Sequence, residues 1–292
     1  GMLSTREIKQ RIRSITSIKQ ITRAMEMVAA SRLKKVESRV LASRAFTEKM
    51  NSVLNHLVSS LESAHTWFAE KEQAVPVIKV ILITADKGLC GAYNNNIIQK
   101  VVKFIREKTG KEIKLTIIGK KGYLYFSKGR YASLVEKYIP ETVEKVGYGH
   151  VQALAGQLIK EYERNEFGEL HIFFTKFHTV MQSFSTSMRL LPIDKGAFES
   201  KEKKTGGEYI FEPSAEQIIG NLFPKFVETR LYQCILESLT SEYAARRVAM
   251  IAATENAGEM IEELTSSYNK ARQSAITKEL LEVVSGAEAL IR

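Results

Sequence analysis

The chain has 292 residues, 44% of them hydrophobic, so it is long and apolar enough to bury the core of one or two domains. This composition excludes a wholly disordered chain. The formal net charge of +10 points to an acidic partner, which could be nucleic acid, an anionic membrane surface or an acidic protein. No apolar run approaches the ~20 residues of a membrane span, and the first residues lack the pattern of a signal peptide.

The two cysteines, Cys90 and Cys234, are far apart in the sequence and belong to no CxxC or Cys/His cluster. Such spacing indicates neither a disulfide framework nor a zinc site. A reducing compartment is therefore expected.

Residues 4 to about 60 are predicted to form one long helix, because no glycine or proline interrupts them. With a linker, this first segment is 2–75. Ser4 and Glu7 have the spacing of a capping box, in which each side chain bonds the backbone amide of the other residue. Apolar residues then recur in steps of mostly three and four, a narrow stripe typical of a coiled coil. The stripe consists of Ile8, Ile12, Ile15, Ile18, Ile21, Met25, Val28, Leu33, Val36 and Val40.

The first predicted helix carries most of the positive charge, because residues 2–40 contain ten basic and three acidic residues. A nucleic-acid-binding surface would usually add aromatic residues or a groove-reading module, and this helix has only Phe46 before Trp67. A basic surface that faces solvent or a protein is therefore favoured. A membrane-surface helix would need a wide apolar face, which the narrow stripe does not provide.

The segment 76–212 is predicted to form a central α/β domain. Residues 77–84 are apolar and β-branched and lie between Pro76 and an Asp-Lys-Gly turn, as suits a buried strand. Strands and helices alternate, which indicates a mostly parallel, Rossmann-like sheet with an antiparallel final strand pair. The other strands are expected at 113–118, 170–175 and 181–193, the helices at 96–108 and 148–163, and a polar loop at 194–212.

A second long helix is predicted within 213–292. A capping box begins at Ser214, but Pro224 is expected to end a short first helix, so that the long helix starts near Lys225. The two end helices are best buried against each other as a long antiparallel coiled coil, which leaves the tip of the longer C-terminal helix to project or to meet a partner. Its inward positions are expected at Phe226, Ile235, Leu239, Met250, Ala253, Ala257, Ile261, Leu264 and Tyr268.

No stretch of the sequence has the residues of a catalytic site. Residues 86–91 (Asp-Lys-Gly-Leu-Cys-Gly) follow a predicted strand, where a phosphate-binding loop would lie, but they match no phosphate-loop pattern and suit a tight turn better. Cys90 has no recognisable base among the histidines, so a buried thiol is favoured. His171 and His178 lack metal-ligand spacing. The residues alone indicate a non-enzymatic coiled-coil protein with an α/β domain, without cofactor or metal.

Four stretches, in order and spread over essentially the whole chain, closely resemble the gamma subunit family of F-type ATP synthases. They are ITRAMEMVAASRL (21–33), ITADKGLCGAYN (83–94), EYAARRVAMIAATENA (242–257) and YNKARQSAITKELLEVVSGA (268–287). The resemblance implies a central-stalk rotor subunit that couples proton- or sodium-driven rotation to the conformational cycling of catalytic beta subunits and performs no chemistry itself. The alternative that the residues alone leave open is a stand-alone basic coiled-coil protein that binds nucleic acid.

The resemblance also implies partners and a location. The paired end helices would stand inside a hexamer of alpha and beta subunits, and the α/β domain would contact the epsilon subunit and the membrane c-ring. No nucleic acid, cofactor or direct membrane insertion is implied. Because no presequence precedes Met2, a bacterial protein is expected, peripheral on the cytoplasmic side of the inner membrane.

Specific roles follow from the resemblance at matching positions. Contacts with beta subunits are expected from Arg23, Met25, Glu242, Arg246, Arg272, Gln273 and Thr277. An apolar bearing tip, held in a sleeve at the top of the hexamer, is expected from Leu280, Leu281, Val283, Val284 and Leu290. Arg247 departs from the family, in which methionine is common at that position.

Overall fold

The computed structural model describes residues 4–59, 75–141, 143–194 and 215–291. The chain forms two compact units. We call Ala30–Arg246 the sheet unit, and we call Gly1–Ala29 together with Arg247–Arg292 the helix unit. Two helices, α1 (Thr5–Ser59) and α5 (Ala215–Ile291), contribute residues to both units. Among the described helices, none has an apolar stretch long enough to cross a bilayer.

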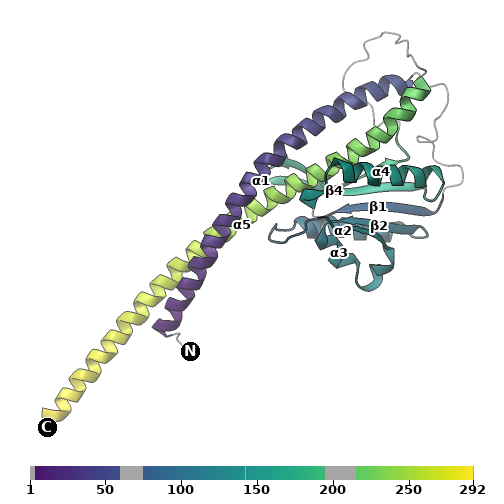
Figure 1. Cartoon of the computed structure of the whole chain (residues 1–292). Coiled ribbons are helices and arrows are strands. Elements are labelled where there is room, and N and C mark those ends of the chain that lie inside the picture. Colours follow the sequence, from purple (N-terminus) through teal and green to yellow (C-terminus); the bar gives the residue numbers. More distant parts are fainter. Residues whose placement is uncertain (1–3, 60–74, 142, 195–214, 292) are drawn as a thin grey trace. The chain divides into compact units, whose positions relative to one another are not determined.

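The sheet unit contains one five-stranded sheet in the order β3-β2-β1-β4-β5 (Figure 1). The four strands β1 to β4 pair in parallel, and β5 pairs with β4 in the antiparallel sense. The predicted, mostly parallel sheet with an antiparallel final pair is therefore confirmed. The strands are β1 (Val77–Ile83), β2 (Glu112–Ile118), β3 (Val135–Ile139), β4 (Glu169–Thr179) and β5 (Gln182–Leu191).

Each face of the sheet is covered by helices (Figure 1). On one face, α2 (Tyr93–Glu107) and α3 (Lys120–Phe126) pack on Val80 and Leu82 of β1. On the other face, α4 (Tyr148–Glu163) and the sheet-unit parts of α1 and α5 pack on Ile81 and Ile83. Because β1 is buried on both faces, its sequence is a continuous apolar run rather than an alternating one. Two short 3-10 helices, Gly129–Leu134 and Val143–Lys145, complete the unit.

Two short elements of the sheet unit escape prediction from the sequence. The strand β3 has five residues at an edge of the sheet, and its central Glu and Lys side chains are exposed, so no apolar run marks it. The helix α3 begins after Gly119 and contains Gly122, residues that read as a loop. Gly122 instead serves close packing, because a Cβ atom at this position would come within 2.9 Å of Thr84 Oγ1.

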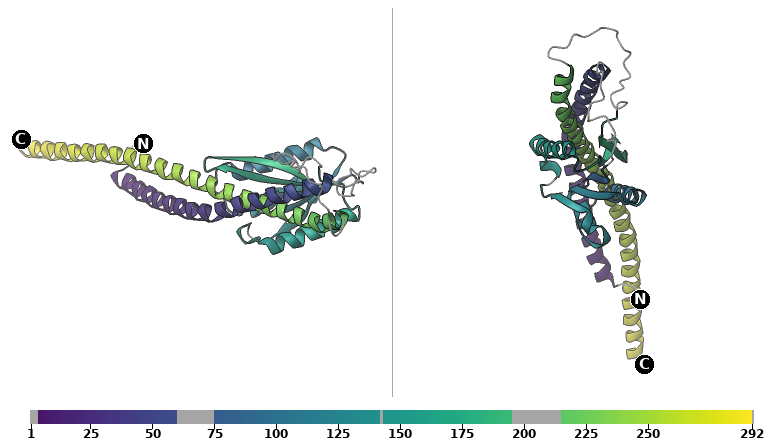
Figure 2. Two further views of the ribbon diagram at one scale, coloured as in Figure 1. Left: turned by 90° about the horizontal axis from the view of Figure 1, so that it is seen from above. Right: turned by 90° about the vertical axis from the view of Figure 1, so that its right-hand side faces the viewer.

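The two long helices pair in antiparallel fashion within each unit. In the sheet unit, Thr47 Oγ1 donates to Gln233 Oε1 at 3.0 Å, and Arg39 bonds the Tyr232 hydroxyl. In the helix unit, the hydroxyl groups of Thr22 and Thr254 lie 2.8 Å apart. The predicted antiparallel coiled coil is thus confirmed, and the green and blue ribbons of the sheet unit run side by side in both figures (Figures 1 and 2).

The predicted inward positions of the second helix are largely correct. Phe226, Ile235, Leu239, Met250 and Ala257 are buried. The remaining positions, Ala253, Ile261, Leu264 and Tyr268, are half-buried. The helix therefore keeps one face toward its partner over nearly all of the predicted range.

The predicted break at Pro224 is wrong, because α5 continues through this residue without interruption. Proline lacks the amide hydrogen that would bond the carbonyl four residues earlier. That earlier residue is Gly220, which is exposed, so its carbonyl can be satisfied by water. The neighbouring Phe223 and Phe226 are buried in the core of the sheet unit and hold the helix in place.

The predicted capping box at the start of α1 is confirmed. The amide of Ser4 donates to Glu7 Oε2 at 2.8 Å, and the amide of Glu7 donates to Ser4 Oγ at 3.3 Å. Ser214 of the second predicted capping box lies outside the described residues. So do the linker after the first helix, nearly all of the polar loop at 194–212, and the predicted domain boundary at residue 212.

Candidate functional site

Glu242 and Arg246 lie one turn apart on α5 and form a buried ion pair. Arg246 Nη1 donates to Glu242 Oε1 at 2.7 Å, and the two side chains are 8% and 10% exposed. The remaining donors of Arg246 face the loop between β1 and α2. Its Nε donates to the carbonyl of Gly88 at 3.3 Å, and its Nη2 donates to the carbonyls of Lys87 and Gly88 at 3.2 Å. The guanidinium group therefore holds this loop against the helix.

The loop is shaped by contacts at its start and by unusual backbone angles at its tip. Asp86 Oδ1 accepts from the amide of Lys120 at 3.1 Å, and Oδ2 accepts from the amide of Val143 at 2.8 Å. Leu89 and Gly91 have φ angles of 60° and 57°. A left-handed conformation costs a residue such as leucine about 1–2 kcal/mol, yet the Leu89 side chain is exposed. The surrounding contacts, rather than burial of Leu89, hold the loop in this conformation.

The loop at 86–91 is the predicted tight turn and has the wrong polarity for a phosphate. A phosphate-binding loop directs backbone amides at its ligand, whereas this loop directs carbonyl groups at Arg246. The place is nevertheless the topological switch point of the sheet, where open α/β sheets bind ligands. Here α5 lies against it, and the Tyr93 hydroxyl donates to the carbonyl of Ser238 at 3.0 Å. The chain fills this position with its own helix.

Burial raises the pKa of two acidic groups beside the loop, Glu242 and Cys90. Burial raises the pKa of Glu242 above its ordinary value, and Arg246 opposes the rise. Burial also raises the pKa of the Cys90 thiol, whose Sγ accepts from Asn94 Nδ2 at 3.4 Å. The predicted buried thiol is confirmed, because Cys90 is 2% exposed. At neutral pH the thiol therefore remains protonated and is a poor nucleophile.

His171 and His178 both lie within β4, and neither belongs to a group of three potential metal ligands among the described residues. His171 Nε2 lies 2.6 Å from Glu169 Oε2, and no third ligand joins them. More generally, no group of three or more His, Cys, Asp or Glu side chains that could hold a metal ion occurs among the residues described here.

In the helix unit, Arg23 is exposed and Met25 is half-buried on α1. The seam between the helices differs here from the predicted stripe. Thr22 and Ala29 are buried, whereas the predicted residues Ile21 and Val28 are 59% and 52% exposed. Small and hydroxyl side chains let the helices approach closely, as the bond between Thr22 and Thr254 shows. Beside Arg23 and Met25, α1 therefore presents an exposed apolar surface.

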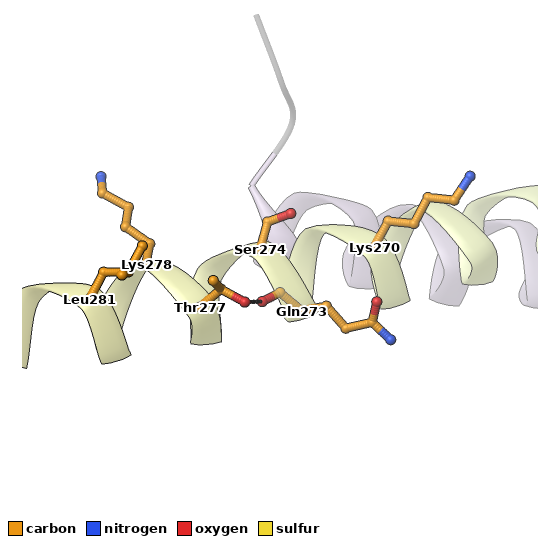
Figure 3. A pocket seen from close by; sticks show the side chains of 6 residues that line it. All are labelled: Lys270, Gln273, Ser274, Thr277, Lys278 and Leu281. Carbon is orange, nitrogen blue, oxygen red and sulfur yellow. Dashed lines mark hydrogen bonds between the residues drawn. The ribbon is translucent and has the colours of Figure 1, made fainter.

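The C-terminal segment Arg272–Leu290 has no buried residue. Thr277 Oγ1 donates to the carbonyl of Gln273 at 2.9 Å, a bond within the helix. These two residues line a shallow hollow, together with Lys270, Ser274, Lys278 and Leu281. Figure 3 shows the ammonium groups of Lys270 and Lys278 extending away from the side-chain amide of Gln273. Lys278 pairs with Glu282 at 3.9 Å, and the polar groups of Gln273 and Lys270 are exposed to another molecule.

The end of α5 exposes a group of large apolar side chains. Exposed apolar groups clustered in this way mark interaction surfaces. The five predicted tip residues are Leu280, Leu281, Val283, Val284 and Leu290, and each is more than half exposed. Ile276, which was not predicted, is also exposed. It lies about two helical turns before Val283, on the same face of the helix.

The predicted contact residues fall into separate groups. Glu242 and Arg246 bond each other inside the sheet unit, while Gln273 and Thr277 lie one turn apart in the helix unit. Their contacts with beta subunits, and the bearing role of the tip, stay predictions. The partner of Arg246, the loop at 87–88, was missed, although the glycines of this loop mark a place where the backbone can be approached closely.

Comparison with known proteins gives a consistent result. The family model described as ATP synthase matches residues 4–290. The ATP synthase gamma chain of Desulfitobacterium hafniense is 38% identical over 289 residues, which cover 99% of this chain and all of that one. The gamma chain of Heliobacterium modesticaldum is 39% identical over 295 residues, with coverage of 99% and 100%.

Solved structures share the fold. A chain of the Euglena gracilis mitochondrial ATP synthase, described as OSCP/F1/c-ring, matches with a TM-score of 0.66 at 17% identity, covering 98% of this chain and 94% of that chain. A chain of the Tetrahymena thermophila central stalk and c-ring matches with a TM-score of 0.59 at 24% identity, covering 80% and 99%. The alternative of a stand-alone nucleic-acid-binding protein finds no support in these relatives.

Proposed function

Because this chain belongs to the family of ATP synthase gamma chains, we propose that it is the central-stalk rotor subunit of a proton- or sodium-translocating F-type ATP synthase. It couples ion-driven rotation to the conformational cycling of the catalytic beta subunits. The observation that carries this proposal is the long antiparallel helix pair whose C-terminal segment, Arg272–Leu290, is exposed on all sides. A segment without a core of its own suits an axle that turns inside other subunits.

The proposal assigns no catalysis to the chain itself. The switch point of its sheet is filled by α5, which supports the proposal that nucleotide chemistry belongs to other subunits of the complex. The chain acts mechanically, by presenting different side chains to each beta subunit in turn. Contacts that must form and break repeatedly should be few, polar and exposed, as Arg23, Arg272 and Gln273 are.

The partners follow from the same proposal. They are a hexamer of alpha and beta subunits around the helix pair, an epsilon subunit and a membrane c-ring at the α/β domain of residues 76–212, with neither nucleic acid nor insertion into the bilayer. The assembly lies on the cytoplasmic side of a bacterial inner membrane. Glu242 and Arg246 are almost fully buried. We therefore propose that they act indirectly, by fixing the loop at 87–88 that contacts a beta subunit.

The test is reconstitution from separate subunits. The chain is mixed with alpha and beta subunits of the same enzyme, the complex is isolated by size, and its ATPase activity is compared with that of alpha and beta alone. A complex of all three with strongly raised activity is expected, because an asymmetric axle is needed for the beta subunits to act in turn. Recovery of only free chain and inactive subunits would contradict the proposal.

A further inference from the structure

The strand β4 is longer than its parallel neighbour, which leaves part of one edge without a strand. The pairing of β1 with β4 ends at Phe173, and β4 continues to Thr179. Over this extension, β4 has a neighbouring strand, β5, on one edge and no strand on the other. The backbone groups of Thr175 and Phe177 on the opposite edge would be buried without partners, which is costly.

Side chains of the two long helices take the place of the missing strand. The amide of Thr175 donates to Ser238 Oγ at 3.2 Å, and its carbonyl accepts from Ser241 Oγ at 3.2 Å. The amide of Phe177 donates to Glu237 Oε2 at 2.9 Å, and its carbonyl accepts from Arg44 Nη2 at 2.6 Å. Side chains of α1 and α5 thus bond all four backbone groups. They replace the hydrogen bonds that a longer β1 would make to this edge of β4.

Arg44 and Glu237 close this arrangement into a three-way contact between α1, α5 and β4. Arg44 Nε donates to Glu237 Oε1 at 2.6 Å, and Nη2 donates to Oε2 at 2.7 Å, a bidentate pair. The Glu237 side chain is 2% exposed. By contrast, both side chains of the pair between Arg32 and Glu144 are about half exposed, and pairs of that kind contribute little.

Directional bonds resist sliding in a way that apolar packing does not. Burial of apolar surface is non-directional, so a helix can shift along a sheet while most of its buried area is kept. A hydrogen bond, by contrast, weakens steeply once its length or angle departs from the optimum. The bonds to Thr175 and Phe177, like those of Arg246 to the loop at 87–88, are therefore contacts that a twisting load on the helix pair would have to break.

We propose that Arg44 and Glu237, with Ser238 and Ser241, form the joint through which torque passes between the helix pair and the sheet. This inference rests on the proposed rotor function. These side chains act as positioning residues, since they hold β4 and the two helices in register. In the proposed rotor, the helix pair contacts the alpha and beta subunits, and the α/β domain contacts the epsilon subunit and the c-ring. If the joint slips, the α/β domain can therefore rotate without turning the helix pair.

The substitution Glu237→Gln tests the joint with little change of shape. It removes the negative charge that Arg44 bonds directly and leaves the donors of Arg44 with one acceptor fewer. Loss of a bond of this charged kind raises the population of the broken state by about tenfold or more. The control is Glu107→Gln, which removes an exposed ion pair with Lys103 on α2, far from β4 in the sequence.

The measurement is ATPase activity of the complete enzyme in sealed vesicles, before and after an uncoupler removes the ion gradient. In wild type the gradient opposes rotation, so the uncoupler should raise the rate. With Glu237→Gln we expect the ratio of the two rates to fall toward one and the steady gradient to shrink, while the uncoupled rate and the amount of assembled enzyme remain near wild type. Glu107→Gln should behave as wild type.

The outcomes separate the two proposals. A wild-type chain that never restores coupling contradicts the rotor function itself. A wild-type chain that couples, beside a Glu237→Gln enzyme with an unchanged ratio, contradicts the joint. If Glu237→Gln prevents assembly, Arg44→Lys replaces it, because lysine keeps the charge but cannot bond Glu237 and Phe177 together in the same fork. An unchanged ratio with Arg44→Lys then overturns the inference, and a loss that matches the loss of assembled enzyme overturns it equally.

Discussion

Arg272 and Arg246 differ in burial and in their bonding partners. Arg246 is buried and uses its donors within the chain, whereas Arg272 is exposed and no hydrogen bond or ion pair joins it to another described residue. An exposed arginine of this kind has donors free for a partner, in a planar arrangement that fits a carboxylate. The two arginines, both expected to contact a beta subunit, therefore have different structural roles.

Arg272→Ala should lower coupled ATP synthesis more than it lowers assembly. A lone exposed ion pair contributes at most about 1 kcal/mol, which corresponds to about a fivefold change in affinity. Force transmission through that contact would be lost entirely. The measurement compares the yield of assembled enzyme with its synthesis rate, and Arg106→Ala, which removes an exposed arginine on α2, is the control. Equal losses of yield and synthesis rate would refute the prediction.

Individual side chains were the least predictable part of the molecule. The apolar stripe placed Ile21 and Val28 in the helix seam, but Thr22 and Ala29 occupy it, because close approach favours small side chains over large ones there. Glu237 gave no signal either. Its role depends on Phe177, sixty positions earlier, and on Arg44 of the other helix, and no local pattern relates these three positions.

At the level of the elements, the capping box makes the stability of the first turn of α1 depend on pH. The hydrogen bond from the Ser4 amide lowers the pKa of Glu7, with help from the Ser4 hydroxyl. A lowered pKa in the folded state means that the cap stabilises the helix fully above the ordinary value for glutamate. This contribution is lost as the pH falls through the lowered pKa.

Glu7→Gln should abolish this pH dependence. Amide hydrogen exchange of the first turn is measured as protection factors across the acidic range, where wild type is expected to lose protection as the pH falls. Glu7→Gln should show weaker protection with no such transition. Ser4→Ala, which removes the capping hydroxyl at a cost of about 1 kcal/mol to the helix end, should lower protection at every pH. A transition in Glu7→Gln like that of wild type would contradict the assignment.

Elements with a strong periodic signal were predicted well. The predicted helix at 148–163 coincides with α4, and the run at 77–84 is β1 to within one residue. Pro224 misled the prediction, because the exposed Gly220 and the buried phenylalanines beside it let α5 continue. β4 extends to Thr179, beyond its predicted end, because β5 pairs with one edge as far as Thr179 and side chains of the helices bond Thr175 and Phe177 on the other edge, which no feature of its own sequence reveals.

For the whole molecule, the end of α5 adds no packing against another element to the stability of the isolated chain. Every residue from Arg272 to Leu290 is exposed, and the last apolar contacts lie earlier in the helix. A chain that ends after Ala271 should therefore unfold at the same temperature as the full chain. It should also form a weaker complex with alpha and beta subunits, because the apolar tip is missing.

A longer truncation provides the comparison. A chain that ends after Glu259 also lacks the half-buried Ile261, Leu264 and Tyr268, so its unfolding temperature should fall. Thermal unfolding followed by circular dichroism checks both chains. A lowered unfolding temperature for the chain ending at Ala271 would show that the tip has contacts within the molecule.

The side-chain pairing of β4 also has a consequence for biosynthesis. Phe177 leaves the ribosome sixty residues ahead of Glu237, its bonding partner. At about 5–20 residues per second this interval lasts about 3–12 s. During that time the nascent sheet has an open edge that any other extended chain could pair with. The last helix to be translated is thus the one that closes the sheet, and a ribosome that stalls before residue 237 releases a chain prone to aggregate.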